Sequence, residues 1–227
     1  MPCPKDPSRT DITGRAYAGS QRQIQIYVNE RPLELCNAVA DALQPCKLHE
    51  SAIRWVSPLA ADNHSEYRDE EFLEIIGAGH LAPKLRDFWP QKGPCWDALA
   101  RLDGGGCLLV EAKSHVPEVY GSGCGASGGS LSLIESSLGK TKEWLAASPD
   151  ADWLGRLNQS ANRLAYLYFL REIGKVDAFL ANVYFTGDPH SPTTRQEWDE
   201  GIKVVTEQLG IASPVPHSVS VFLEAVR

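Results

Sequence analysis

An aspartate, a glutamate and a lysine stand close together on two segments that we predict to be neighbouring strands. Asp97 lies fourteen residues before Glu111, and Lys113 follows Glu111 by two residues. Because side chains alternate between the two faces of a strand, Glu111 and Lys113 lie on the same face of the segment 107–113. Two carboxylates and an amine in this arrangement can bind a divalent cation and orient a water molecule, so we expect a metal-and-water site here.

The loop between the two strands decides whether the carboxylates meet. The predicted strands 96–102 and 107–113 are joined by Asp103 and three glycines, residues that tolerate the left-handed backbone of a tight hairpin. A two-residue loop, 104–105, would place Asp97 opposite Ala112, whereas a three-residue loop, 103–105, places it directly across from Glu111. The longer loop puts glycine where a left-handed conformation is needed, so it is the register that we predict.

Two carboxylates that face each other need a cation to offset their repulsion, and hard oxygen ligands favour Mg²⁺ or Mn²⁺. The pattern of Asp97 followed by Glu111-Ala112-Lys113 resembles the motif of the PD-(D/E)XK nuclease superfamily, an aspartate at the start of one core strand and Glu-X-Lys on the next. The resemblance implies that Asp97 and Glu111 bind the metal, that the carbonyl group of Ala112 completes the coordination, and that Lys113 orients or activates the attacking water. Trp96 stands where the family commonly has a proline.

The same resemblance implies a fold and a partner. The fold would be α/β, with a restriction-endonuclease-like core in which helices flank a central mixed sheet. The substrate would be nucleic acid, in the first place DNA, and many enzymes of this kind act as homodimers. In the family's order, a helix with an acidic residue precedes three antiparallel strands, a second helix and a strand parallel to the motif strand.

Elements in this order can be predicted from the sequence. The segment 65–79 begins with a capping serine, has apolar residues at helical spacing and ends in glycines, so it is the expected first helix. We choose Glu71 on this helix as a further metal ligand, with Glu74 close behind it and a solvated acidic face as the alternative for each. We predict a strand over 84–90 before the hairpin, helices over 131–147 and 153–173, and a buried strand over 178–185.

The remaining segments extend this core within a single domain, 21–227. Residues 1–20 are polar and read as a flexible arm. An N-terminal extension, 21–60, contains a strand over 21–28, a helix over 33–43 and a short strand over 52–57. The core occupies 65–190, and the C-terminal part, 195–227, contains a helix over 195–209 and a closing strand over 217–226.

Three polar residues on the predicted helix 153–173 are accessory candidates for the site. Gln159, Arg163 and Tyr166 follow one another at spacings of four and three residues, so they share a helix face that can point toward the active cleft. An alternative stays open, in which Arg163 pairs with an acidic neighbour and Tyr166 packs in the core.

Composition indicates where such a protein would work. The chain has 227 residues, of which 43% are hydrophobic, and it contains no apolar stretch long enough to span a membrane. The N-terminus lacks a signal-peptide pattern, and the six cysteines form no CxxC pair, so we expect reduced thiols in the cytoplasm.

The net charge of −7 argues against a broadly basic surface for nucleic acid. A local stripe could still be made by the basic residues near the motif, which are Lys84, Arg86, Lys92 and Arg101, or Lys140 and Lys142. The sequence therefore predicts a Mg²⁺-dependent nuclease. Two alternatives remain: a nuclease-fold module that binds without cutting, and a purely structural ion pair of Lys113 with a carboxylate.

Overall fold

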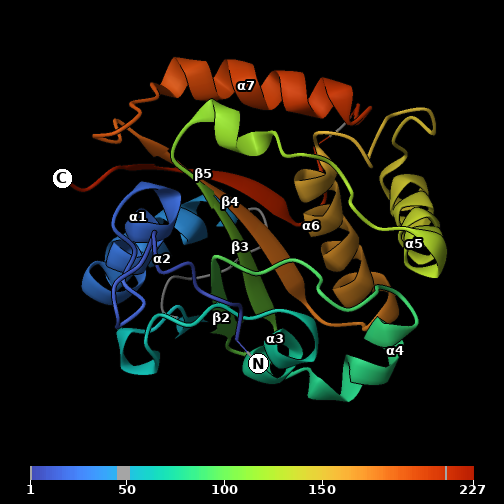
Figure 1. The fold of residues 1–227 in the computed structure, drawn as a ribbon, viewed down its shortest axis with the longest axis horizontal. Coiled ribbons are helices and arrows are strands. Elements are labelled where there is room, and N and C mark those ends of the chain that lie inside the picture. The colour runs from blue at the N-terminus through green and yellow to red at the C-terminus, as the bar shows by residue number, and fades with distance from the viewer. Residues whose placement is uncertain (1, 45–51, 213) are drawn as a thin grey trace.

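The centre of the computed structural model, which describes residues 2–44, 52–212 and 214–227, is a five-stranded sheet with the strand order β1-β2-β3-β4-β5 (Figure 1). The strands are β1 (Ile53–Ser57), β2 (Ala98–Leu102), β3 (Cys107–Lys113), β4 (Ala178–Thr186) and β5 (Ser218–Glu224). Neighbours from β1 to β3 run antiparallel, whereas β3, β4 and β5 run parallel to one another. The prediction of an α/β fold with a mixed sheet flanked by helices is confirmed.

Helices cover both faces of this sheet (Figure 1). They are α1 (Gly19–Glu30), α2 (Pro32–Ala42), α3 (Asp69–Ile76), α4 (Ala82–Arg86), α5 (Gly128–Leu145), α6 (Asn158–Tyr168), which continues as a π-helix over Phe169–Ile173, and α7 (Arg195–Gln208). Alternate residues of β3 enter two separate cores: Leu109 packs with the layer of α3 to α6, and Leu108 packs with α1 and α2. Among the described residues, no helix has the length and apolar character that crossing a membrane requires.

The hairpin of β2 and β3 has the register that the sequence predicts. Arg101 pairs with Cys107, and the N–H group of Leu102 donates to the carbonyl of Gly106 at 2.8 Å, which leaves a three-residue loop. Gly104 and Gly105 have φ angles of +90° and +92°, conformations that other residues rarely adopt. Continuing this register by one pair beyond β2 places Asp97 across from Glu111.

One predicted element before the hairpin, the strand 84–90, is wrong, and the acidic helix has different bounds. The segment 84–90 is not a strand, because α4 ends at Arg86 and Pro83 lies in its first turn, where proline favours a helix start. The strand that pairs with β2 is β1, which precedes the acidic helix instead of following it. The acidic helix itself is shorter than predicted. It begins at Asp69 because Tyr67, just before it, forms a β-bridge with Trp96.

The predicted strand 21–28 is also wrong, since these residues belong to α1. Its alternating glutamines and aliphatic residues suggest one polar face, yet Gln23 and Gln25 are both buried. Gln25 bonds to the backbone of Ala16 and Gly14, and Gln23 bonds to the backbone of Val226 at both ends of its amide. Because these hydrogen bonds satisfy the buried amides, a helix surrounded by protein can carry them.

The other predicted elements are found within a few residues of their expected bounds. These are the helices 33–43, 131–147, 153–173 and 195–209 and the strands 96–102, 107–113, 178–185 and 217–226. The predicted strand 52–57 corresponds to β1.

The cysteines differ from the prediction of free thiols. Cys3 and Cys95 form a disulfide that joins the N-terminal segment to the residues before β2, while Cys107 and Cys124 are free thiols. Cys46 lies outside the described residues. The segment 2–18 packs on the rest of the chain, with Cys3 and Ala16 buried, and its mobility stays a prediction.

Candidate metal and catalytic site

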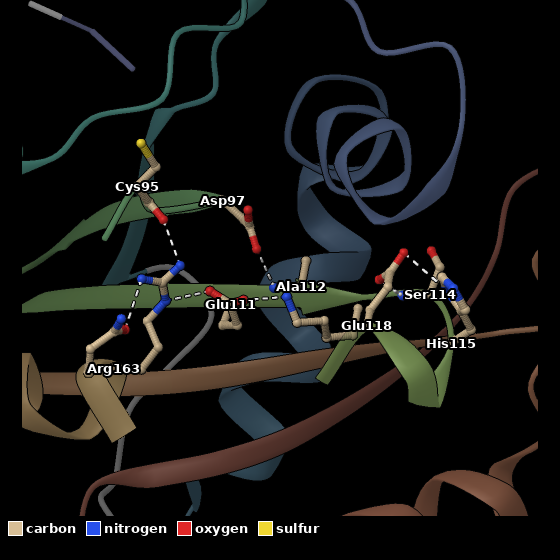
Figure 2. A network of polar contacts seen from close by, with 10 residues as sticks. Cys95, Asp97, Glu111, Ala112, Ser114, His115, Glu118 and Arg163 are labelled. Atoms are coloured by element: carbon tan, nitrogen blue, oxygen red, sulfur yellow. Dashed lines mark hydrogen bonds and ion pairs between the residues drawn. The ribbon is translucent and has the colours of Figure 1, made fainter. Parts of the chain in front are cut away.

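The three motif residues meet where β2 begins and β3 ends. Asp97 lies one residue before β2, and one oxygen of its carboxylate, Oδ2, accepts the backbone N–H of Ala112 at 2.7 Å (Figure 2). Glu111 and Lys113 project from the same face of β3, and the Lys113 ammonium lies 2.5 Å from Oε1 of Glu111. The predicted grouping of Asp97, Glu111, Ala112 and Lys113 is therefore present.

Glu111 is buried between two cations. Its second oxygen, Oε2, accepts from Nε of Arg163, and the side chains of Glu111 and Arg163 are only 7% and 5% exposed. Arg163 also donates to the carbonyl of Cys95 at 2.7 Å, and its guanidinium lies 4.7 Å from the ring centroid of Trp96. Figure 2 shows Arg163 reaching from α6 to the hairpin, so this residue ties a helix and two strands together.

Burial and charge shift the pKa values of these groups in opposite directions. Burial and the neighbouring Glu111 carboxylate raise the pKa of Asp97 to about 8. Burial alone would raise the pKa of Glu111, but Arg163 and Lys113 outweigh it and the pKa is lowered. Burial would likewise lower the pKa of Lys113, yet the carboxylates of Glu111 and Asp97 hold it above its usual value. The site at neutral pH thus contains an ionised glutamate, a protonated lysine and an aspartate that retains its proton.

A third carboxylate, Glu66, belongs to this electrostatic group and was not predicted. Burial raises the pKa of Glu66, the adjacent Glu111 raises it further, and the amide of Gln21 on α1 donates to its Oε1 at 2.8 Å. The bridge between Tyr67 and Trp96 brings Glu66 beside the hairpin. Sequence reasoning missed it because it placed Ser65 at the cap of a helix, which would have turned Glu66 into a solvated first-turn residue.

Of the remaining candidates, Arg163 lies in the site and Tyr166 lies in the core. Arg163 takes the alternative role, since it pairs with an acidic neighbour, Glu111. Tyr166 is fully buried among aromatic rings, with Trp89 at 5.5 Å and Phe72 at 5.6 Å between ring centroids. The Tyr166 ring therefore takes the alternative role and packs in the core.

The two other candidates, Gln159 and Glu71, lie on α6 and α3. Gln159 is half-buried one turn before Arg163 on α6. Glu71 lies on α3 and lines a hollow against α4, together with Arg86 and Leu85. Glu66 interacts with Asp97 and Glu111 from the segment just before this helix.

The donor set suits a hard divalent cation in its chemistry, because it offers carboxylate oxygens and a strand carbonyl. Asp97 supports this fit, because its carboxyl group interacts electrostatically with those of Glu111 and Glu66 and accepts a hydrogen bond from the neutral amide of Ala112. Two cationic side chains already hold Glu111, however. Within the described part of the chain, no three His, Cys, Asp or Glu side chains are grouped as a ready metal cage.

Most of the basic residues expected near the cleft hold the fold locally. Lys84, Arg101 and Lys142 donate to backbone carbonyls, and Arg86 pairs with Glu70 at 2.6 Å. Their charges are used within the fold, which does not support a basic stripe built from these four residues.

Neither a protein-family model, nor a curated protein, nor a solved structure matches this chain.

Proposed function

We propose that the protein is a metal-dependent phosphodiester hydrolase that acts on nucleic acid, with Asp97 and Glu111 as metal ligands. One observation carries the proposal: the hairpin register places Asp97 across from Glu111, with Lys113 on the same face as Glu111. A sheet that only needs to fold gains nothing from burying two carboxylates side by side, since each raises the cost of ionising the other.

The cation would be Mg²⁺ or Mn²⁺, held by Asp97, Glu111 and the carbonyl of Ala112. Such an ion supplies a Lewis acid for the phosphoryl oxygen and lowers the pKa of a bound water. Asp97 would lose its proton when the ion binds, because a ligating carboxylate must be ionised. Glu111 is already ionised, and its two cationic partners keep it so.

Lys113 acts in this scheme as a fixed positive charge. Its raised pKa keeps the ammonium protonated at neutral pH, so it cannot accept a proton from water. It instead stabilises the negative charge that develops on the phosphoryl group, as pre-oriented donors do in other hydrolases. Arg163 pairs with the other oxygen of Glu111, Oε2, and helps to keep this carboxylate ionised.

A second function is favoured by a separate observation. Both oxygens of Glu111 are paired with Lys113 and Arg163, which is what a structural ion network at the sheet would require. The alternative is therefore a protein in which this group is a structural ion network, either a structural protein or a nuclease-fold module that binds its partner without cutting it.

A cleavage assay with matched variants tests the proposal. Wild-type protein is incubated with single- and double-stranded DNA and with RNA, in Mg²⁺, in Mn²⁺ and in EDTA. We expect metal-dependent cleavage that falls by at least about 100-fold in Asp97→Asn, Glu111→Gln and Lys113→Met, the loss typical of removing one group that stabilises developing charge. Glu135→Gln, which changes an exposed glutamate of α5, is the control and should cleave like wild type.

Two outcomes would contradict the proposal in different ways. Equal cleavage by wild type and Glu111→Gln would show that the activity comes from elsewhere. Tight binding of nucleic acid with no cleavage in any metal would support the non-cutting module instead.

A further inference from the structure

The disulfide between Cys3 and Cys95 lies next to the candidate metal site. It joins residues that are 92 positions apart, and Cys95 precedes Asp97 by only two residues. Cys3 is 7% exposed, so the bond is enclosed on its N-terminal side. In Figure 2 the carbonyl of Cys95 points toward Arg163, and its sulfur points away from the carboxylates.

The same cross-link contacts the backbone of both segments that carry acidic site residues. The N–H group of Cys3 donates to the carbonyl of Glu66 at 2.8 Å, and the carbonyl of Cys95 accepts from Arg163 at 2.7 Å. Cys3 therefore stands between the Glu66 segment and the Asp97 segment and fixes each to the other. Through Arg163, the position of Cys95 is also linked to Glu111.

Noncovalent contacts also hold the residues just before β2, where Trp96 is fully buried. The backbone N–H of Gly93 donates to the carboxylate of Asp69 at 2.8 Å, and that of Trp96 donates to the carbonyl of Tyr67 at 3.1 Å. The disulfide is the covalent restraint in this segment. A ligand such as Asp97 must stay within a fraction of an ångström of its working position, so its supporting contacts matter as much as its own atoms.

We propose that Cys3 and Cys95 are positioning residues for the metal site, and that reduction of their disulfide by a dithiol weakens binding of the divalent cation. The inference rests on the proposed function, because it assumes that Asp97 binds metal. It adds regulation of metal binding by the redox state of this disulfide, which the motif does not imply.

The chemistry is ordinary thiol–disulfide exchange. A thiolate of the dithiol attacks one protein sulfur, the protein S–S bond breaks, and a mixed disulfide forms. The second thiol of the reductant then displaces the protein sulfur. Two electrons and two protons pass to the protein, which leaves two thiols on Cys3 and Cys95 and an intramolecular disulfide on the reductant.

Binding of Mn²⁺ alone, measured by titration calorimetry, tests the proposal on the full chain. Air-oxidised wild type is compared with wild type treated with dithiothreitol, and mass spectrometry confirms the state of each. We expect the dissociation constant to rise by about 10- to 100-fold on reduction, as it does when supporting contacts of metal ligands are lost. The variant Cys3→Ser/Cys95→Ser should match reduced wild type and should not respond to dithiothreitol.

Cys124→Ser is the matched control, since it removes a free thiol and leaves the disulfide intact. It should bind Mn²⁺ as oxidised wild type does and should lose affinity on reduction. A purely structural disulfide would lower the melting temperature and leave the Mn²⁺ affinity unchanged, and that result would overturn the proposal. Free thiols at Cys3 and Cys95 after air oxidation would overturn it as well.

Amide hydrogen exchange separates this inference from the proposed function. We expect faster exchange of residues 93–97 on reduction, whether or not metal is present, and unchanged exchange would refute the positioning role. If Mn²⁺ binds to neither redox state, the metal site itself is wrong, and the exchange result still decides whether the disulfide holds this segment.

Discussion

Replacing Arg163 with methionine is the perturbation whose cost the structure defines best. The guanidinium is 5% exposed, pairs with Glu111, donates to the Cys95 carbonyl and lies over the Trp96 ring. Methionine keeps much of the apolar contact but leaves Glu111 with Lys113 as its one remaining cationic partner among these contacts. Removing one partner of a buried ion pair costs about 3 to 5 kcal/mol. Here Oε2 of Glu111 and the carbonyl of Cys95 would stay buried without their donor.

Urea unfolding at pH 7 in EDTA, followed by circular dichroism, measures this cost. We expect Arg163→Met to lower the free energy of unfolding by about 3 to 5 kcal/mol. The control is Arg54→Met, which removes an exposed pair with Asp103 at 3.7 Å and should cost less than about 1 kcal/mol. A loss below about 1 kcal/mol in Arg163→Met as well would refute the description of Glu111 as a buried, doubly paired carboxylate.

The same variant links stability to the proposed metal. Since Arg163 and a cation would compete for Glu111, Mn²⁺ should restore more stability to Arg163→Met than it adds to wild type. At a free Mn²⁺ concentration of 100 times the dissociation constant, binding contributes about 2.7 kcal/mol. Equal stabilisation of the two proteins would show that Arg163 and the metal do not share a ligand.

The remaining predictions concern the pH dependence of metal binding and the effect on stability of replacing two glycines. Because Asp97 has a pKa of about 8 and must be ionised to bind metal, Mn²⁺ affinity should rise about tenfold per pH unit from pH 6 to 8 and then level off, as calorimetry can measure; a dissociation constant independent of pH would contradict this. A Cβ on Gly93 would overlap the buried Tyr166 hydroxyl, so Gly93→Ala should cost about 1 to 3 kcal/mol in urea unfolding. In contrast, Gly139→Ala, inside α5 with open space around it, should gain about 0.5 to 1 kcal/mol, and equal effects of the two changes would refute this packing.

The hairpin and the grouping of its polar side chains were predictable because local rules determine them. Loop glycines set the register of β2 and β3, and strand alternation then sets which residues share a face. Consequently, the pairing of Asp97 with Glu111 could be predicted from one loop. The buried strand β4 was equally clear from its run of apolar and β-branched residues.

What could not be predicted depends on contacts between distant segments. The helix α1 carries an alternating pattern typical of a strand, and it can bury Gln23 and Gln25 because backbone groups of distant segments bond to their amides. Similarly, Glu66 is brought to the site by the β-bridge between Tyr67 and Trp96, which cannot be predicted from the local sequence pattern. The partner of Cys3 lies 92 residues away, at a spacing that forms no recognisable motif.

The position of β1 in the sheet could not be predicted from the local sequence either. The order of elements that the resemblance implies has a strand between the acidic helix and the hairpin, and we predict it over 84–90. The proline at 83 instead starts α4, and the sheet takes its edge strand from before the helix. Sheet order depends on which strands bury their faces together, and a single segment does not encode that choice.

A crystal structure determined after soaking with Mn²⁺ tests the central claim most directly. The account predicts an anomalous peak bound by the carboxylates of Asp97 and Glu111 and by the carbonyl of Ala112, with Asp97 no longer protonated. Glu111 held only by Arg163 and Lys113, with no Mn²⁺ at Asp97, would contradict it.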